Sequence, residues 1–162
     1  MSAVLTSPAG TPPLAQELEA SPRVLSLIKD LALFLGASIE QAREASRTGT
    51  IALESRSVAL VPDADEQALI MAAPLPADCL DDPARRVAAL RASTRLILQF
   101  GIVFARGFSG PQLLCRCPLA SASLAVVGQT ILQLAALANA VQAGSASTGE
   151  LAIGQAGRSH GG

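Results

Sequence analysis

The chain has no tryptophan and no tyrosine, and four phenylalanines are the only aromatic residues among its 162. Hydrophobic residues nevertheless make up 50% of the sequence. Alanine, leucine and valine therefore have to fill the core of the single domain that this length predicts. Small aliphatic side chains bury little area each, and burial contributes about 25 cal/mol per Å² of apolar surface. The composition therefore favours a protein that gains further buried area from a second subunit.

The groups that catalysis usually needs are scarce. The one histidine, His160, lies in the glycine- and serine-rich C-terminal segment, so no histidine relay can form inside the fold. The only lysine, Lys29, lies within a predicted helix, and the chain contains no phosphate-binding loop. The stretch GFSGP resembles a nucleophile elbow, but Pro111 stands where the final glycine belongs. We predict that the protein is no enzyme, has no catalytic residue and needs no cofactor.

Cysteine is also rare, and its three positions argue against a disulfide framework. An odd number of cysteines fits a reducing cytoplasm best. In PQLLCRCPL, Cys115 and Cys117 alternate with Arg116, so a strand would point both thiols to the face that carries Leu113. Free cysteine behaves as a small hydrophobe, and we predict that this face is buried and binds no metal. A thiolate–metal protein with Cys79 as a third ligand is an alternative.

Charge of one sign does not dominate the chain. Twelve basic and thirteen acidic residues leave a formal net charge of −1, which excludes a strongly basic protein built for nucleic acid or an anionic membrane surface. The opening MSAVLTSPAGTPPLAQ has neither a basic region nor a long apolar core, so we do not expect a signal peptide. We predict disordered segments at residues 1–20 and 144–162 around one domain at 21–143.

Three helices are indicated by their caps and by their apolar periodicity. Ser21 and Pro22 predict a helix start, and the helix should end at Gly36. Asp82 and Pro83 start a second helix that continues to about residue 99. Ser121 or Ser123 starts a third, which should end at Gly144. The polar stretch SIEQAREASRTG, at residues 38–49, is compatible with either a short helix or a loop.

Five strands fill the remaining sequence. The runs TIALES, SVALVP and QALIMAAP alternate in polarity and predict an antiparallel meander. GIVFARGF and QLLCRCPL, joined across a Ser-Gly-Pro turn, predict a hairpin. The fold class is therefore α+β, with the order α-β-β-β-α-β-β-α and a short twisted antiparallel sheet flanked by helices.

The predicted middle helix is apolar on two opposite faces. A helix of this kind must be covered on both sides, whereas the sheet can cover only one. Arg91 and Arg95, one turn apart, lie between the two faces and are compatible with a solvated stripe or with steering of acidic partners. The first face consists of Val87, Leu90, Thr94, Ile97 and Leu98, and the second of Ala89, Ala92, Leu96 and Phe100.

The last predicted helix lies in a segment without charge, from Arg116 to Glu150. About 20 apolar residues suffice to span a membrane, so a small membrane-anchored protein is the alternative function. Glutamines within the helix and its high alanine content favour a buried amphipathic helix instead. Its main apolar stripe is predicted at Leu124, Val127, Ile131, Leu134, Ala138 and Val141.

The order of these elements resembles the Tir-chaperone (CesT-type) family, the class I chaperones of bacterial type III secretion. The residues that carry the resemblance span about 21–143. They are RVLSLIKDLALFLG as the first helix, TIALES, SVALVP and QALIMAAPLP as the meander, RRVAALRASTRLILQ as the middle helix, GIVFARGFSGPQLLCRCPL as the hairpin and ASLAVVGQTILQLAALANAV as the last helix.

The resemblance implies a function by binding alone. Such chaperones are cytoplasmic homodimers that hold the extended N-terminal segment of secreted effectors and deliver it to the type III export apparatus, without nucleic acid or membrane insertion. The family's dimer interface, on the middle helix and the next strand, corresponds here to Ala89, Ala92, Leu96, Phe100 and Phe104. Effector-binding candidates, each of which could equally belong to the core, are Leu25, Leu33, Leu53, Val58, Leu60 and Ile70.

Overall fold

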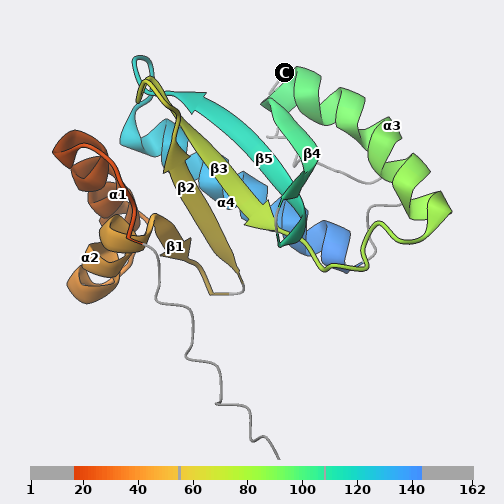
Figure 1. Cartoon of the computed structure of the whole chain (residues 1–162), viewed down its shortest axis with the longest axis horizontal. Helices are drawn as coiled ribbons and strands as arrows, with labels where there is room; N and C mark the ends of the chain where they lie inside the picture. The colour runs from red at the N-terminus through yellow and green to blue at the C-terminus, as the bar shows by residue number, and fades with distance from the viewer. Residues whose placement is uncertain (1–16, 55, 108, 144–162) are drawn as a thin grey trace, which may run out of the picture.

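The computed structural model describes residues 17–54, 56–107 and 109–143, which form four helices and five strands (Figure 1). The predicted disordered segments fall mainly outside these described residues. The elements are α1 (Pro22–Phe34), α2 (Ile39–Thr48), β1 (Thr50–Ala52), β2 (Ser57–Pro62), β3 (Ala68–Pro74), α3 (Pro83–Phe100), β4 (Ile102–Gly107), β5 (Gly110–Pro118) and α4 (Leu124–Gln142).

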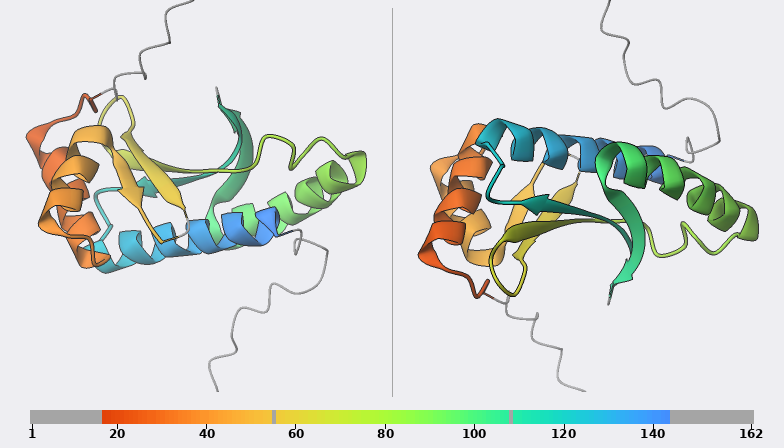
Figure 2. Two further views of the ribbon diagram at one scale, coloured as in Figure 1. Left: turned by 90° about the horizontal axis from the view of Figure 1, so that it is seen from below. Right: turned by 90° about the horizontal axis from the view of Figure 1, so that it is seen from above.

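The five strands form one antiparallel sheet in the order β1-β2-β3-β5-β4. Strands β1 and β4 are its two edges. Helix α4 runs along one face, α1 and α2 pack together at the β1 end, and α3 extends beyond β4 (Figure 2). The predicted α+β class and antiparallel sheet are confirmed, with α2 as an additional helix.

Local capping explains the helix boundaries. Ser21 Oγ accepts a hydrogen bond from the Val24 N–H, as its sequence position predicted. The undecided segment is a helix because Ser38 and Gln41 form a capping box. The Gln41 N–H donates to Ser38 Oγ at 3.2 Å, and the Ser38 N–H donates to Gln41 Oε1 at 2.8 Å. Ser123, rather than Ser121, caps α4.

The core lies between the sheet and the helices α1 and α4. The predicted burial of Cys115 and Cys117 is confirmed, since the two side chains are only 5% and 8% exposed. Phe34, the last residue of α1, is 55% exposed and lies outside this core. The largest fully buried side chains include Ile28, Leu31, Leu60, Met71, Ile131 and Leu134.

Helix α4 has 19 residues and a mean hydropathy of 1.6, enough by length and composition alone to cross a membrane. Core helices of water-soluble proteins meet the same criterion. Here Val127, Ile131, Leu134 and Ala138 are buried, and the helix packs against β2, β3, β5 and α1. The sheet thus accounts for most of the predicted apolar stripe without a membrane.

Arg56 attaches the C-terminal end of α4 to the end of β3. Its Nε donates to Asn139 Oδ1 at 2.9 Å, and its two terminal nitrogens donate to Gln142 Oε1 and to the Pro74 carbonyl. A planar guanidinium can hold several acceptors in fixed directions. The last turn of α4 therefore lies beside the point where β3 leaves the sheet.

Candidate protein-binding site

Helix α3 contacts the rest of the fold along one side. Leu96 is only 3% exposed and belongs to the continuous core, while Ala92 and Phe100 pack against it. Beyond this side the helix extends past the edge strand β4 into open space (Figures 1 and 2). One half of the helix is therefore left without a partner in the described part of the chain.

That exposed half is apolar. Its large side chains have exposed fractions between 47% and 81%, and contiguous apolar patches of this kind mark interaction sites. Thr94 continues the same stripe. We call the following set the α3 surface: Val87, Leu90, Ile97 and Leu98.

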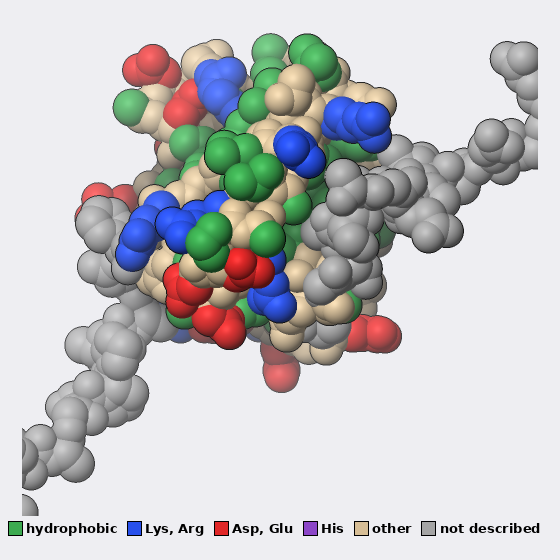
Figure 3. Space-filling view, turned by 90° about the vertical axis from the view of Figure 1, so that its right-hand side faces the viewer, with side chains coloured by type: hydrophobic (Ala, Val, Ile, Leu, Met, Phe, Trp, Pro, Cys, Tyr) green, Lys and Arg blue, Asp and Glu red, His purple; other side chains and the backbone are tan. Residues whose placement is uncertain are grey.

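The helix is also strongly basic, which the near-zero net charge conceals. Arg85, Arg86, Arg91 and Arg95 are its only charged residues. Figure 3 shows hydrophobic and basic side chains together on this side of the molecule, with acidic side chains toward the bottom and at the upper left. This basic helix was not identified from the sequence, although the distribution of charge along the chain indicates it. Seven of the twelve basic residues follow Asp82, but only one of the thirteen acidic residues does.

A second apolar surface is the face of the sheet opposite α4. Strand alternation turns every second residue of β2, β3, β4 and β5 to this side, and the register places them in neighbouring rows. Val61 is 47% exposed and the others are half-buried. We call this set the open sheet face: Ala59, Val61, Ile70, Ala72, Val103 and Leu114.

One ion pair stands at the border of the open sheet face. Arg116 Nη2 lies 2.8 Å from Asp63 Oδ2. Hydrogen bonds from the Ala68 N–H, from Arg116 and from the Gln67 N–H to the same carboxylate lower the pKa of Asp63. The carboxylate thereby holds the β2–β3 turn in place, beside the apolar rows.

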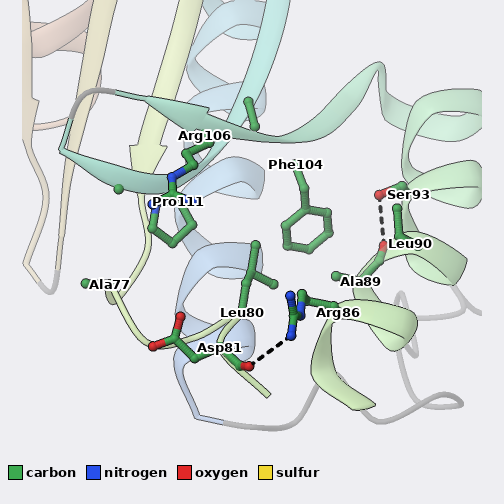
Figure 4. A pocket seen from close by; sticks show the side chains of 12 residues that line it. Ala77, Leu80, Asp81, Arg86, Ala89, Leu90, Ser93, Phe104, Arg106 and Pro111 are labelled. Atoms are coloured by element: carbon green, nitrogen blue, oxygen red, sulfur yellow. Dashed lines mark hydrogen bonds between the residues drawn. The ribbon is translucent and has the colours of Figure 1, made fainter. Parts of the chain in front are cut away.

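A groove separates α3 from the β4–β5 hairpin and the loop before α3. Its volume is about 750 Å³, within the range of ligand-sized pockets. Figure 4 shows the Phe104 ring between Leu80 and Ala89, with Arg86 Nη2 donating to the Asp81 carbonyl at 3.3 Å. We call it the α3 groove, and its lining includes Leu80, Asp81, Arg86, Leu90, Phe104 and Arg106.

The six predicted effector-binding residues differ in burial and lie on different sides of the fold. Ile70 belongs to the open sheet face, and Leu33 is 39% exposed on α1. Leu25 and Leu53 are half-buried. Val58 and Leu60 are fully buried on the opposite side of the sheet, because α4 packs there. The structure therefore brings no single patch together from all six.

The five predicted dimer residues lie mostly on the inner side of α3. Leu96 is buried in its own subunit, which makes it inaccessible to a second copy in this conformation. Ala92, Phe100 and Phe104 are half-buried against the same core, and Ala89 lines the α3 groove. The two-faced character of the helix was recognised from its sequence, but the exposed face is the one that carries Leu90.

The cysteines offer no reactive centre. Burial raises the pKa of Cys79, Cys115 and Cys117, which keeps the thiols protonated and weakly nucleophilic at neutral pH. Across residues 17–54, 56–107 and 109–143, no cluster of three or more histidine, cysteine or acidic side chains could hold a metal ion.

No family model matches the sequence, and no curated protein has a significantly similar sequence. Solved structures that share the fold include chains of two complexes. A chain of the ExsC–ExsE complex matches with a TM-score of 0.56 at 19% identity, over 75% of this chain and 92% of that one. A chain of the HopA1–SchA chaperone–effector complex matches with a TM-score of 0.56 at 12% identity, over 73% of this chain and 91% of that one. At these identities the likeness establishes the fold alone.

Proposed function

We propose that this chain is a bacterial cytoplasmic chaperone of the class I, Tir-chaperone type, which binds the N-terminal segment of type III effectors and keeps it export-competent. The observation that carries the proposal is the likeness, over about three quarters of the chain, to a structure from a chaperone–effector complex. The exposed apolar surfaces give the same proposal a physical basis. The mechanism requires binding alone, with no catalytic residue, metal or cofactor.

The open sheet face is the surface we assign to the effector. An extended segment can lay alternate apolar side chains on such a face, and the free edges β1 and β4 can add main-chain hydrogen bonds. Val61 and Ile70 lie opposite each other on this face, in the row that continues to Arg116. Leu33, 39% exposed, offers a further apolar contact on α1. Ordering an extended client offsets much of the gain from apolar burial. The complex should therefore form reversibly, as delivery to an export apparatus requires.

The α3 surface is the one we assign to a second copy of the chain. Three of its four large side chains are at least half exposed, and in a monomer they would face water. A self-complementary patch across a twofold axis buries the same residues on both copies. Ala89 and Phe104 lie next to this surface, at the α3 groove. The proposed interface thus keeps part of the predicted one and replaces Leu96 by Leu90 and Leu98.

Effector binding is tested by co-purifying the chain with N-terminal segments of candidate type III effectors. Ile70→Asp puts a charge on the open sheet face and should weaken capture about tenfold, equivalent to about 1.4 kcal/mol. Ala136→Asp, at an exposed position of α4, is the matched control and should bind like the unmodified chain. Equal capture by both variants, or capture of no segment, would contradict the proposal.

A further inference from the structure

We propose that the stretch ELAI, residues 150–153 of this same chain, binds in the α3 groove. Glu150 lies between the guanidinium groups of Arg86 and Arg106, and the two large aliphatic side chains of the stretch contact Phe104 and Leu80. The proposal concerns an intramolecular ligand and does not depend on the identity of any effector.

The charges of the groove favour an acidic ligand. Arg86 and Arg106 both line the groove, and within the described part of the chain neither lies within 4 Å of a carboxylate oxygen. Among the described residues, the guanidinium of Arg86 donates a hydrogen bond only to the backbone carbonyl of Asp81. Glu150 is the one acidic residue of the whole chain that follows Asp82. Asp81 is the one acidic residue of the described lining, so two arginines against one carboxylate leave the groove with a formal charge of +1. The nearest carboxylate along the chain beyond α4 is that of Glu150.

The apolar side chains of the stretch also match those of the groove. The groove combines charged side chains with apolar ones, notably Leu80 and Phe104, both only half-buried. After the end of α4, Leu151 and Ile153 are the only large hydrophobic residues in the sequence. They follow Glu150 directly and alternate, so an extended backbone turns them to one side. An extended stretch thus presents Glu150 on one side and the two apolar side chains on the other, which suits a groove with both charged and apolar residues in its walls.

The stretch can reach the groove from the end of α4. Arg56 binds Gln142 at the end of α4 and the carbonyl of Pro74 with the same guanidinium. The next residue, Leu75, donates its N–H to the carbonyl of Pro111, which lines the groove, at 2.9 Å. The chain therefore leaves α4 close to the groove. Residues 144–149 add a reach of about 20 Å when extended.

Because the stretch is covalently attached to the domain, weak contacts are enough to hold it in the groove. A segment tethered through a short linker experiences an effective concentration of the order of millimolar. The tail can thus occupy the groove with modest affinity and still be displaced by a better ligand. Because Leu90 belongs to both the groove and the α3 surface, an occupied groove shields part of the surface assigned to the second copy. This consequence, unlike the docking itself, rests on the proposed function.

Photo-crosslinking in the full chain tests the docking. Leu151→p-benzoylphenylalanine should crosslink within one copy, and the product should map to the loop before α3, to α3 or to β4. The same amino acid in place of His160 is the control and should give little product there. Absence of crosslinks to the groove overturns the proposal. So does a product formed only between two copies, which would identify a second chain as the source of the ligand.

A charge exchange separates specific docking from chance encounters. Glu150→Arg and Arg106→Glu should each reduce the intramolecular crosslink several-fold, and the double variant should recover it. Thermal unfolding of each variant establishes that it is folded. Equal yields in all four proteins, or no recovery in the double variant, overturn the proposal. The readout requires neither an effector nor a dimer, so its failure is distinguishable from failure of the proposed chaperone function.

Discussion

Single side chains in this protein are held by burial and by hydrogen bonds to the backbone, and only rarely by ion pairs. The ion pairs in the described part of the chain involve Arg47 and Arg116, and such exposed pairs contribute little to stability. Glu66 is more informative, because it accepts the Ser21 N–H at 2.7 Å and so joins the start of α1 to the β2–β3 turn.

The three thiols should resist modification in the folded protein. Burial raises their pKa values and limits both the thiolate fraction and access of a reagent. With Ellman's reagent at neutral pH, native protein should release colour slowly, whereas three equivalents should react rapidly in denaturant. Rapid reaction of the native protein would contradict the buried placement of Cys115 and Cys117.

Replacing Glu66 should make the midpoint of thermal unfolding depend less on pH. Hydrogen bonds from Ser21 lower the pKa of Glu66 below its ordinary value of 4.5. A lowered folded pKa contributes stability above the unfolded value, and this contribution is lost as the pH falls through the folded value. Glu66→Gln should therefore lower the midpoint of thermal unfolding at pH 7, and the difference should shrink below about pH 4.5.

Asp30, exposed on α1, provides the control for this measurement. Asp30→Asn should shift the midpoint of thermal unfolding less than Glu66→Gln does at pH 7. If the deficit of Glu66→Gln stays constant down to pH 3, the hydrogen-bonded carboxylate is not the cause.

At the scale of elements, two helices end on glycines with nearly the same backbone angle but different surroundings. Gly49 after α2 has φ +68°, and Gly101 after α3 has φ +64°. A Cβ at Gly49 would lie 2.7 Å from the Leu60 carbonyl oxygen, whereas a Cβ at Gly101 would meet nothing within 4 Å. The tight junction at Gly49 is where the helical pair meets the sheet.

Gly49→Ala should therefore destabilise the fold more than Gly101→Ala. Both substitutions place a side chain in the left-handed region, which costs about 1–2 kcal/mol. Only Gly49→Ala adds a clash with backbone, because its neighbour is a carbonyl of β2. Denaturant unfolding should show a lower free energy of unfolding for Gly49→Ala than for Gly101→Ala. Equal losses would mean that β2 moves away at little cost.

At the scale of the whole molecule, the described residues leave two apolar surfaces uncovered. The α3 surface lies beyond the β4 edge, and the open sheet face lies opposite α4 (Figure 2). Because the two surfaces are separate, the proposed second copy and the proposed client would not compete for the same residues. The acidic first half and the basic second half of the chain further make the molecule electrostatically uneven, which favours oriented association.

Oligomeric state tests the role of the α3 surface. Leu98 is 81% exposed on α3, and Leu132 is 50% exposed on α4. Light scattering at micromolar concentration should give the mass of two copies for the unmodified chain and for Leu132→Glu, but of one copy for Leu98→Glu. A buried charge without a partner is strongly unfavourable at an interface. A stable monomer of the unmodified chain would contradict the proposed dimer.

Rules that involve only neighbouring residues in the sequence predicted much of the fold. Ser21, Pro22 and Asp82 start helices where predicted, because a cap depends on neighbouring residues. Alternation in β5 likewise placed Cys115 and Cys117 on one face. The same rules left α2 undecided, since its polar sequence has no long apolar stripe, although its capping box was present. They also left the charge asymmetry of the two halves unnoticed.

The sequence by itself determined which residues share a face, because helix and strand periods are local properties of the backbone. Only the tertiary structure decided which face of each element is covered. Val58 and Leu60 are buried because α4 packs on their side of β2, whereas Val61 and Ile70 stay accessible on the other side. On α3, the sheet covers Leu96 and leaves Leu90 exposed. Both faces are apolar, so the choice rests on contacts between segments far apart in the chain.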